Sequence, residues 1–149
     1  MTDADFEEFV RTVDPQLRRA LSGHLPQDQV ADAVAEAFAY AWQHWERVSE
    51  MDNAAGYLFR VAQSKSRRRK DGFLPWADDD RVPDSEPSLI PALLSLSPSQ
   101  ARAVWLVHGC GWSHAEAAVA LGITTSTVST HVSRALEHLR ARLGVTDDA

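Results

Sequence analysis

The sequence predicts an all-α fold of two small helical domains joined by an acidic, proline-rich linker. Apolar residues recur at intervals of three and four along most of the 149-residue chain, which is the spacing of amphipathic helices. Residues 73–91 instead combine prolines with clustered acids, a composition typical of a linker. We therefore expect a first domain over residues 1–72 and a second over residues 92–145.

The first domain is expected to be helical from about Asp3 into a basic tract that ends near Lys70. The Asp14–Pro15 pair should break or restart its first helix, because proline lacks an N–H donor. A long helix should open after Pro26, with Asp28 as its cap, and carry an apolar stripe that extends to Trp42 and Trp45. A polar connection then leads from Ser49 to a last helix that begins near Ala54.

Two capping boxes open the helices of the second domain. In the first, Ser97 precedes Pro98 at the first helical position and Gln100 follows, so a helix should run to about residue 108, where glycines end it. In the second, Ser113 is followed by Glu116, and a short alanine-rich helix should reach residue 121. This order of signals predicts a helix-turn-helix, a motif that binds duplex DNA.

A third helix should follow Gly122, whose lack of a Cβ suits a left-handed turn, with Thr124 or Thr125 as its cap. In a helix-turn-helix this last helix enters the major groove, and hydroxyl and arginine side chains there can reach bases or phosphates. Its buried stripe is predicted to be Val128, Val132, Leu136, Leu139 and Leu143. The polar positions away from that stripe are Ser126, Ser129, Thr130, Ser133, Arg134 and Glu137.

Charge and composition narrow the function. The net charge of −6 implies weak DNA binding by the chain alone, because phosphate neutralisation supplies most non-specific affinity. The acidic N-terminus does not resemble a signal peptide, no apolar run is long enough to span a membrane, and the single Cys110 fits a reducing compartment, so we expect a cytoplasmic protein. We expect no metal, since His108, Cys110 and His114 flank a turn without a further ligand pair. No nucleophilic or nucleotide-binding motif is visible, so we expect no cofactor and no enzymatic activity.

The order of parts resembles the extracytoplasmic-function sigma factors, the promoter-specificity subunits of bacterial RNA polymerase. In the second domain the resemblance rests on L-S-P-S-Q-A-R-A-V, G-W-S-H-A-E-A-A-V-A-L-G-I and S-T-V-S-T-H-V-S-R-A-L-E-H-L-R. In the first it rests on A-D-A-V-A-E-A-F-A-Y-A-W and G-Y-L-F-R-V-A-Q-S. The chain departs from the pattern at Tyr57, where the family usually has Trp, at Ser64, where Asn is usual, and at Ser129 and His131, which are often basic.

The resemblance implies partners and residue roles. The partners are core RNA polymerase and promoter DNA, and an anti-sigma protein is a further one that the family allows. Docking on the polymerase clamp is implied for Asp32, Glu36 and Phe38. Binding and melting of the −10 element is implied for Met51, Asp52, Asn53, Tyr57, Arg60, Ser64, Arg67 and Arg68. Contact with the −35 element is implied for Ser126, Ser129, Thr130, His131, Ser133 and Arg134.

Two other functions fit part of the sequence. A stand-alone helix-turn-helix regulator of the response-regulator output type would explain the T-V-S-T-H-V-S-R stretch, although the N-terminal half lacks the strand–helix alternation of a receiver domain. A degenerate sigma-like protein that mainly binds another protein would keep the same shape. Binding to core polymerase separates the first alternative from a sigma factor, and initiation at a specific promoter separates the second.

Overall fold

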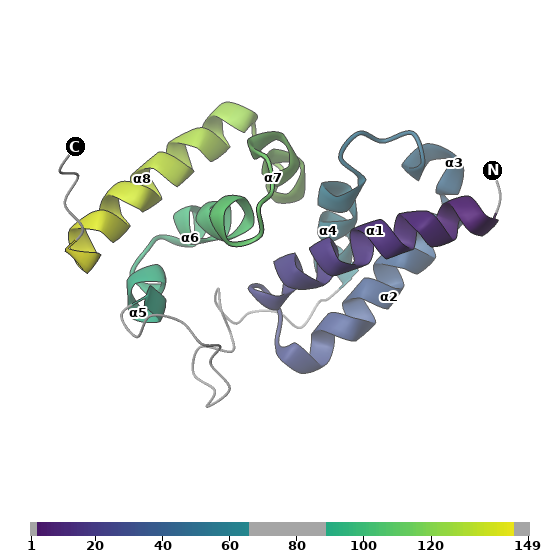
Figure 1. Cartoon of the computed structure of the whole chain (residues 1–149), viewed down its shortest axis with the longest axis horizontal. Coiled ribbons are helices and arrows are strands. Elements are labelled where there is room, and N and C mark those ends of the chain that lie inside the picture. Colours follow the sequence, from purple (N-terminus) through teal and green to yellow (C-terminus); the bar gives the residue numbers. More distant parts are fainter. Residues whose placement is uncertain (1–2, 66–88, 145–149) are drawn as a thin grey trace.

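A computed structural model describes residues 3–65 and 89–144 of the chain, and every element in these two ranges is a helix (Figure 1). The N-terminal range holds α1 (Asp3–Ser22), α2 (Gln27–Gln43), α3 (Trp45–Val48) and α4 (Ala54–Lys65). The C-terminal range holds α5 (Leu89–Leu94), α6 (Pro98–Val104), the π turn η2 (Trp105–Gly109), α7 (His114–Leu121) and α8 (Thr125–Leu143). The predicted all-α class is confirmed.

Helix α1 continues through Pro15, so the predicted break at Asp14–Pro15 is wrong. Proline removes one backbone hydrogen bond, but Pro15 is exposed, so water can satisfy the carbonyl that loses its donor. Asp14 also accepts two hydrogen bonds from Arg18 one turn later, at 2.9 and 3.0 Å. The face opposite, which includes Leu17 and Leu21, is fully buried and holds the helix in place.

Two details of α2 also differ from the sequence prediction. Its N-cap is Pro26, and Asp28 lies in the first turn, where a negative charge favours the positive end of the helix dipole without capping it. The helix ends at Gln43 because His44 leaves the helical conformation, with φ −119° and ψ 33°. Trp45 therefore belongs to α3, and Trp42, expected on the buried stripe, is 51% exposed.

Helices α6, α7 and α8 begin at the N-cap residues that the sequence predicted. The Ser97 hydroxyl accepts from the Gln100 amide at 3.2 Å, and the Ser113–Glu116 capping box is complete. Gly122 adopts the expected left-handed conformation with φ 69°, and Thr124 caps α8 through the Thr127 amide. The last turn before Gly109 is wider than expected, because the Cys110 amide bonds to the Trp105 carbonyl five residues earlier.

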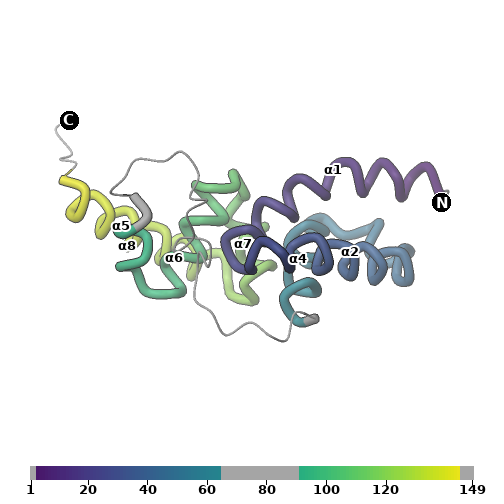
Figure 2. Tube along the Cα trace, turned by 90° about the horizontal axis from the view of Figure 1, so that it is seen from below, coloured from purple at the N-terminus to yellow at the C-terminus, as the bar shows by residue number. Residues whose placement is uncertain are grey.

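The two ranges pack against each other around one continuous core. Helix α4 lies along α7 in both views (Figures 1 and 2), and the buried cluster joins residues of α1, α2 and α4 to residues of α6, η2, α7 and α8. The Trp105 indole donates to the Ala20 carbonyl at 3.2 Å, and Trp112 meets Phe59 edge-on at 5.9 Å between ring centres. A smaller cluster holds α5 and α6 against the C-terminal half of α8.

Candidate nucleic-acid and polymerase interface

The recognition helix of the helix-turn-helix is α8, and its buried stripe fixes which side faces out. Val128, Val132 and Leu139 are buried, while Leu136 and Leu143 are half-buried, as the spacing predicted. The polar residues of the first turns lie opposite this stripe and form one accessible surface on the described part of the chain. Of those expected to meet the −35 element, Ser126, Thr130, Ser133 and Arg134 are exposed, and Ser129 and His131 are half-buried.

The residues expected at the −10 element lie on α4 and on the connection before it. Arg60 and Ser64 are exposed on α4, one turn apart, and Tyr57 is half-buried one turn earlier. In the connection, Asp52 is exposed whereas Met51 and Asn53 are half-buried. Arg67 and Arg68 lie outside the described residues.

The residues expected at the polymerase clamp lie on α2. Asp32 and Glu36 are exposed and four residues apart, so they share one face of the helix. Phe38 points elsewhere, because it is half-buried and meets Phe9 of α1 edge-on, with ring centres 6.2 Å apart. The two carboxylates are thus the accessible part of this set.

The closed packing of the two halves brings the −10 set close to the helix-turn-helix. Gly56 of α4 is buried against α7, so closely that a Cβ there would lie 2.7 Å from the Glu116 carbonyl oxygen. The Arg60 guanidinium lies beside the turn at Gly122, 3.8 Å from where a Cβ would stand. The exposed members of the two expected DNA-contact sets therefore occupy neighbouring parts of the described structure.

A group of polar side chains that the sequence did not single out lies where α2, α3 and α4 meet. The Tyr40 and Tyr57 hydroxyl oxygens are 2.9 Å apart, and Arg47 Nη2 donates to both of them. The His44 ring lies against the Tyr40 ring at a tilt of 40°, with 4.2 Å between ring centres. The hydrogen bond between the hydroxyls and partial burial raise the pKa of Tyr57 above its ordinary value.

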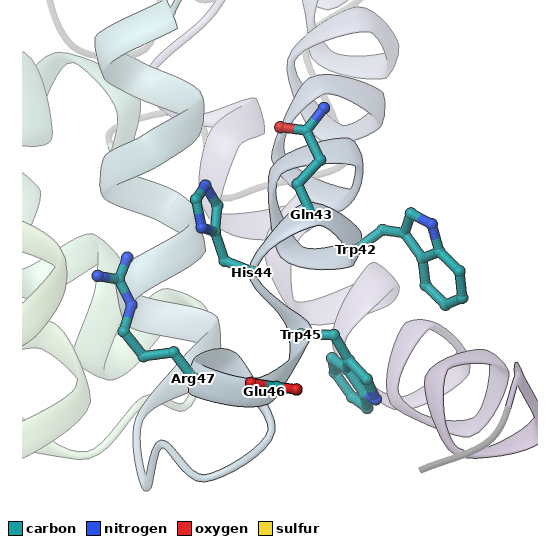
Figure 3. A pocket seen from close by; sticks show the side chains of 6 residues that line it. All are labelled: Trp42, Gln43, His44, Trp45, Glu46 and Arg47. Atoms are coloured by element: carbon teal, nitrogen blue, oxygen red, sulfur yellow. The ribbon is translucent and has the colours of Figure 1, made fainter.

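Beside this group, a surface hollow of about 450 Å³ opens at the bend between α2 and α3 (Figure 3). Its lining is the continuous run Trp42, Gln43, His44, Trp45, Glu46 and Arg47. His44 and Arg47 point toward α4, whereas Trp45 points toward α1, where it packs on Phe9 at 5.0 Å between ring centres. The bend at His44 therefore sends neighbouring side chains to two different helices.

Among residues 3–65 and 89–144, no group of three His, Cys, Asp or Glu side chains could hold a metal ion, and His108, Cys110 and His114 do not form such a group. None of the described helices is both long enough and apolar enough to cross a membrane.

Comparison with known proteins gives the family. The model of sigma-70 region 4 matches residues 88–139. The RNA polymerase sigma-E factors of Streptomyces antibioticus and Streptomyces coelicolor are 32% and 31% identical to the chain, over 96% of it and over 87% and 88% of their own lengths. The chain therefore belongs to the extracytoplasmic-function group of RNA polymerase sigma factors, the subunits that direct the polymerase to promoters.

Solved structures agree. The sigma factor RpoE of Bartonella quintana, in complex with the anti-sigma factor NepR, has a TM-score of 0.67 and 28% identity, over 95% of this chain and 98% of RpoE. CnrH, in complex with the cytosolic domain of CnrY, has a TM-score of 0.65 over 97% of this chain and 89% of CnrH; at 22% identity it supports the fold alone. Since these likenesses span both halves, a stand-alone response-regulator-type protein is not favoured.

Proposed function

We propose that this chain binds core RNA polymerase and directs it to promoters, reading a −10 element with residues 1–72 and a −35 element with residues 92–145. The observation that carries the proposal is the likeness to RNA polymerase sigma-E factors over 96% of the chain. The polymerase performs the chemistry in the cytoplasm, and the chain contributes binding and positioning without a catalytic step of its own.

The accessible side chains support a division of roles. On α2, Asp32 and Glu36 present two carboxylates to the polymerase clamp, and Phe38 fixes that helix on α1. The −10 contacts are assigned to the connection at Met51, Asp52 and Asn53, to Tyr57, Arg60 and Ser64 on α4, and to Arg67 and Arg68, which lie outside the described residues. The −35 contacts are assigned to Ser126, Ser129, Thr130, His131, Ser133 and Arg134 of α8.

The closed arrangement has a consequence for promoter binding. The names of the two elements place them about 25 base pairs apart, which is about 85 Å of B-form DNA at about 3.4 Å per base pair. In the described structure α4 touches α7, and α7 packs on α8. The two DNA-facing surfaces must therefore separate before one chain can engage both elements.

An anti-sigma protein is the other partner that we propose. The structural neighbour RpoE was solved in complex with the anti-sigma factor NepR. Such a partner should abolish promoter-specific starts when it is titrated into a reaction that contains this chain and core polymerase.

Run-off transcription tests the proposed function. Purified core polymerase, with and without this chain, is given fragments of the genome that encodes it, and specific new starts are the expected result. Replacing Ser129, Thr130 and Arg134 with Ala should reduce the preference for the native −35 sequence while core binding persists; Arg102→Gln, on exposed α6, is the control. Core binding without any start would instead indicate a degenerate sigma-like protein, and duplex binding without core binding a stand-alone regulator.

A further inference from the structure

A partly exposed group of hydrogen-bond donors lies beside the residues assigned to the −10 element. We call it the Arg47–tyrosine cluster, and it consists of Tyr40, His44, Arg47 and Tyr57. Arg47 Nη2 donates to both tyrosine hydroxyls, at 2.9 Å for Tyr57, and the guanidinium carbon lies 5.7 Å from the centre of the Tyr57 ring. The cluster ties α2, α3 and α4 together, so its parts are held in fixed positions relative to one another.

The guanidinium of Arg47 keeps donors to spare. Arginine carries N–H groups on Nε, Nη1 and Nη2, and the two tyrosines occupy only those of Nη2. Arg47 is exposed and forms no ion pair with a carboxylate among the described residues. Nη1, with two N–H groups, and Nε, with one, therefore carry a positive charge that no carboxylate neutralises. They do not form one bidentate fork, but each can donate a charge-assisted hydrogen bond to a phosphate oxygen.

The tyrosines add a donor of the same kind. Two phenol protons are present, and the bond between the hydroxyl oxygens uses one of them. Both oxygens already accept from Arg47, so the second proton points to an acceptor outside the cluster. The free donors of the cluster therefore favour an acceptor-rich, anionic ligand.

An aromatic surface lies next to these donors. The exposed His44 ring contacts Tyr40 at a tilt of 40°, and His44 and Arg47 both line the hollow at the α2–α3 bend (Figure 3). Its volume of about 450 Å³ lies within the range of small-ligand sites, about 300–1,000 Å³. A positive group beside aromatic faces is how proteins hold single-stranded nucleic acid, because an unpaired base exposes its face for stacking. Glu46 also lines the hollow, and its negative charge disfavours a phosphate inside it. A phosphate is therefore expected to bind Arg47 outside the hollow.

We propose that the Arg47–tyrosine cluster binds one nucleotide of the unpaired strand at the −10 element, with its phosphate on Arg47 and its base against His44. The inference rests on the proposed function and adds Tyr40, His44 and Arg47 to the residues of that surface. Tyr57 connects the two sets, because it belongs both to the cluster and to the α4 face assigned to the −10 element.

A phosphate scan tests the contact. Polymerase holoenzyme with wild-type chain or with Arg47→Gln is bound to a fork DNA whose −10 segment is single-stranded, and each phosphate is replaced in turn by a neutral methylphosphonate. At one linkage, neutralisation should lower wild-type affinity about tenfold and Arg47→Gln affinity less than about twofold, because only wild type has a charged hydrogen bond to lose. His44→Ala should weaken binding when the adjacent base is present and match wild type on an abasic probe.

Matched variants separate binding from folding. Arg102→Gln makes the same charge change at an exposed position of α6 and should keep the wild-type response at every linkage. Tyr40→Phe keeps the ring and removes one hydroxyl, so it should weaken the response at the same linkage without loss of core binding. Equal responses of wild type and Arg47→Gln at all linkages would overturn the proposal and leave Arg47 as a structural tie between helices. Loss of core affinity in Arg47→Gln without a responding linkage would also overturn it, in favour of a protein contact.

The same scan with the free chain and a single-stranded oligonucleotide needs no polymerase. The responding linkage should reappear at low salt, where phosphate contacts are strongest. If wild-type chain produces no promoter-specific starts, the proposed function fails, and this oligonucleotide scan still decides whether the cluster binds a nucleotide. If starts occur but neither scan finds a responding linkage, only the nucleotide site is wrong.

Discussion

At the scale of single residues, burial controls the chemistry of the only thiol. Cys110 follows η2 and is half-buried against the shared core. Desolvation raises the pKa of the Cys110 thiol above its ordinary value, to about 12, and the positive charge of Arg19 opposes this shift. The thiolate, which is the reactive form, is therefore scarce in the folded chain.

Cys110 should consequently resist alkylation while the chain is folded. At pH 8 iodoacetamide should modify the native chain more than about tenfold more slowly than the chain in urea, because only the unfolded thiol ionises near its ordinary pKa. Folding free energy from this group is fully present below the unfolded pKa and is lost as the pH rises toward the folded one. Mass spectrometry follows the modification, and equal rates in both states would show that the thiol is not desolvated.

At the scale of elements, some helix bounds depend only on residues close in sequence, whereas others depend on contacts between distant parts of the chain. The bounds of α7 and α8 followed from Ser113, Gly122 and Thr124, because a cap or a left-handed turn depends only on residues close in sequence. The course of α1 through Pro15 did not follow, since it depends on which side of the helix faces water.

The candidate site likewise has a part that could be predicted from the sequence and a part that could not. The exposed faces of α4 and α8 were predictable from helical spacing, and the family resemblance pointed to their residues. The Arg47–tyrosine cluster was not predicted, although Tyr40, His44 and Arg47 have the spacing of one helix face. The helix breaks at His44, and the cluster is completed by Tyr57, seventeen residues from Tyr40 on another helix.

Replacing Gly56 with Ala should have two opposing effects on the free energy of unfolding. Intrinsic helix propensity alone would make Gly56→Ala stabilising by about 1 kcal/mol in α4. The added Cβ would instead lie 2.7 Å from the Glu116 carbonyl oxygen and 3.3 Å from the Ala120 amide nitrogen, both of which are backbone atoms that cannot rotate away.

Overpacking of this kind costs about 1–3 kcal/mol, so we expect Gly56→Ala to destabilise the chain and to loosen α4 from α7. Urea unfolding measures the free energy, and hydrogen exchange of α7 amides reports the contact. The control is Ala39→Gly at an exposed position of α2. It should show the helix-propensity effect alone and lower the free energy of unfolding. A Gly56→Ala chain more stable than wild type would contradict the close approach of α4 and α7.

At the scale of the whole molecule, two halves that must act far apart on DNA share one core in the described structure. The Trp105 indole donates a hydrogen bond to the Ala20 carbonyl, Trp112 meets Phe59 edge-on, and α7 packs closely against Gly56. Contacts of α1 and α4 with the helix-turn-helix therefore hold the two halves together. These contacts compete with the separation of about 85 Å that the two promoter elements demand at about 3.4 Å per base pair. Polymerase and DNA must supply the free energy that replaces the shared core. The net charge of −6 leads independently to the prediction that the free chain binds DNA weakly.

This competition predicts a large change in distance between the halves. Spin labels at Arg19→Cys on α1 and His108→Cys on η2, in a Cys110→Ser background, should report a short distance in the free chain, because the Trp105–Ala20 bond joins those two segments. With core polymerase and promoter DNA the distance should exceed about 50 Å, since the labelled domains then follow elements separated by about 25 base pairs. A pair within the first domain, at Arg11→Cys and Ala39→Cys on exposed sites of α1 and α2, should not change. A short distance that persists between Arg19→Cys and His108→Cys in the promoter complex would mean that one chain engages both elements without opening, contrary to the geometry of the closed core.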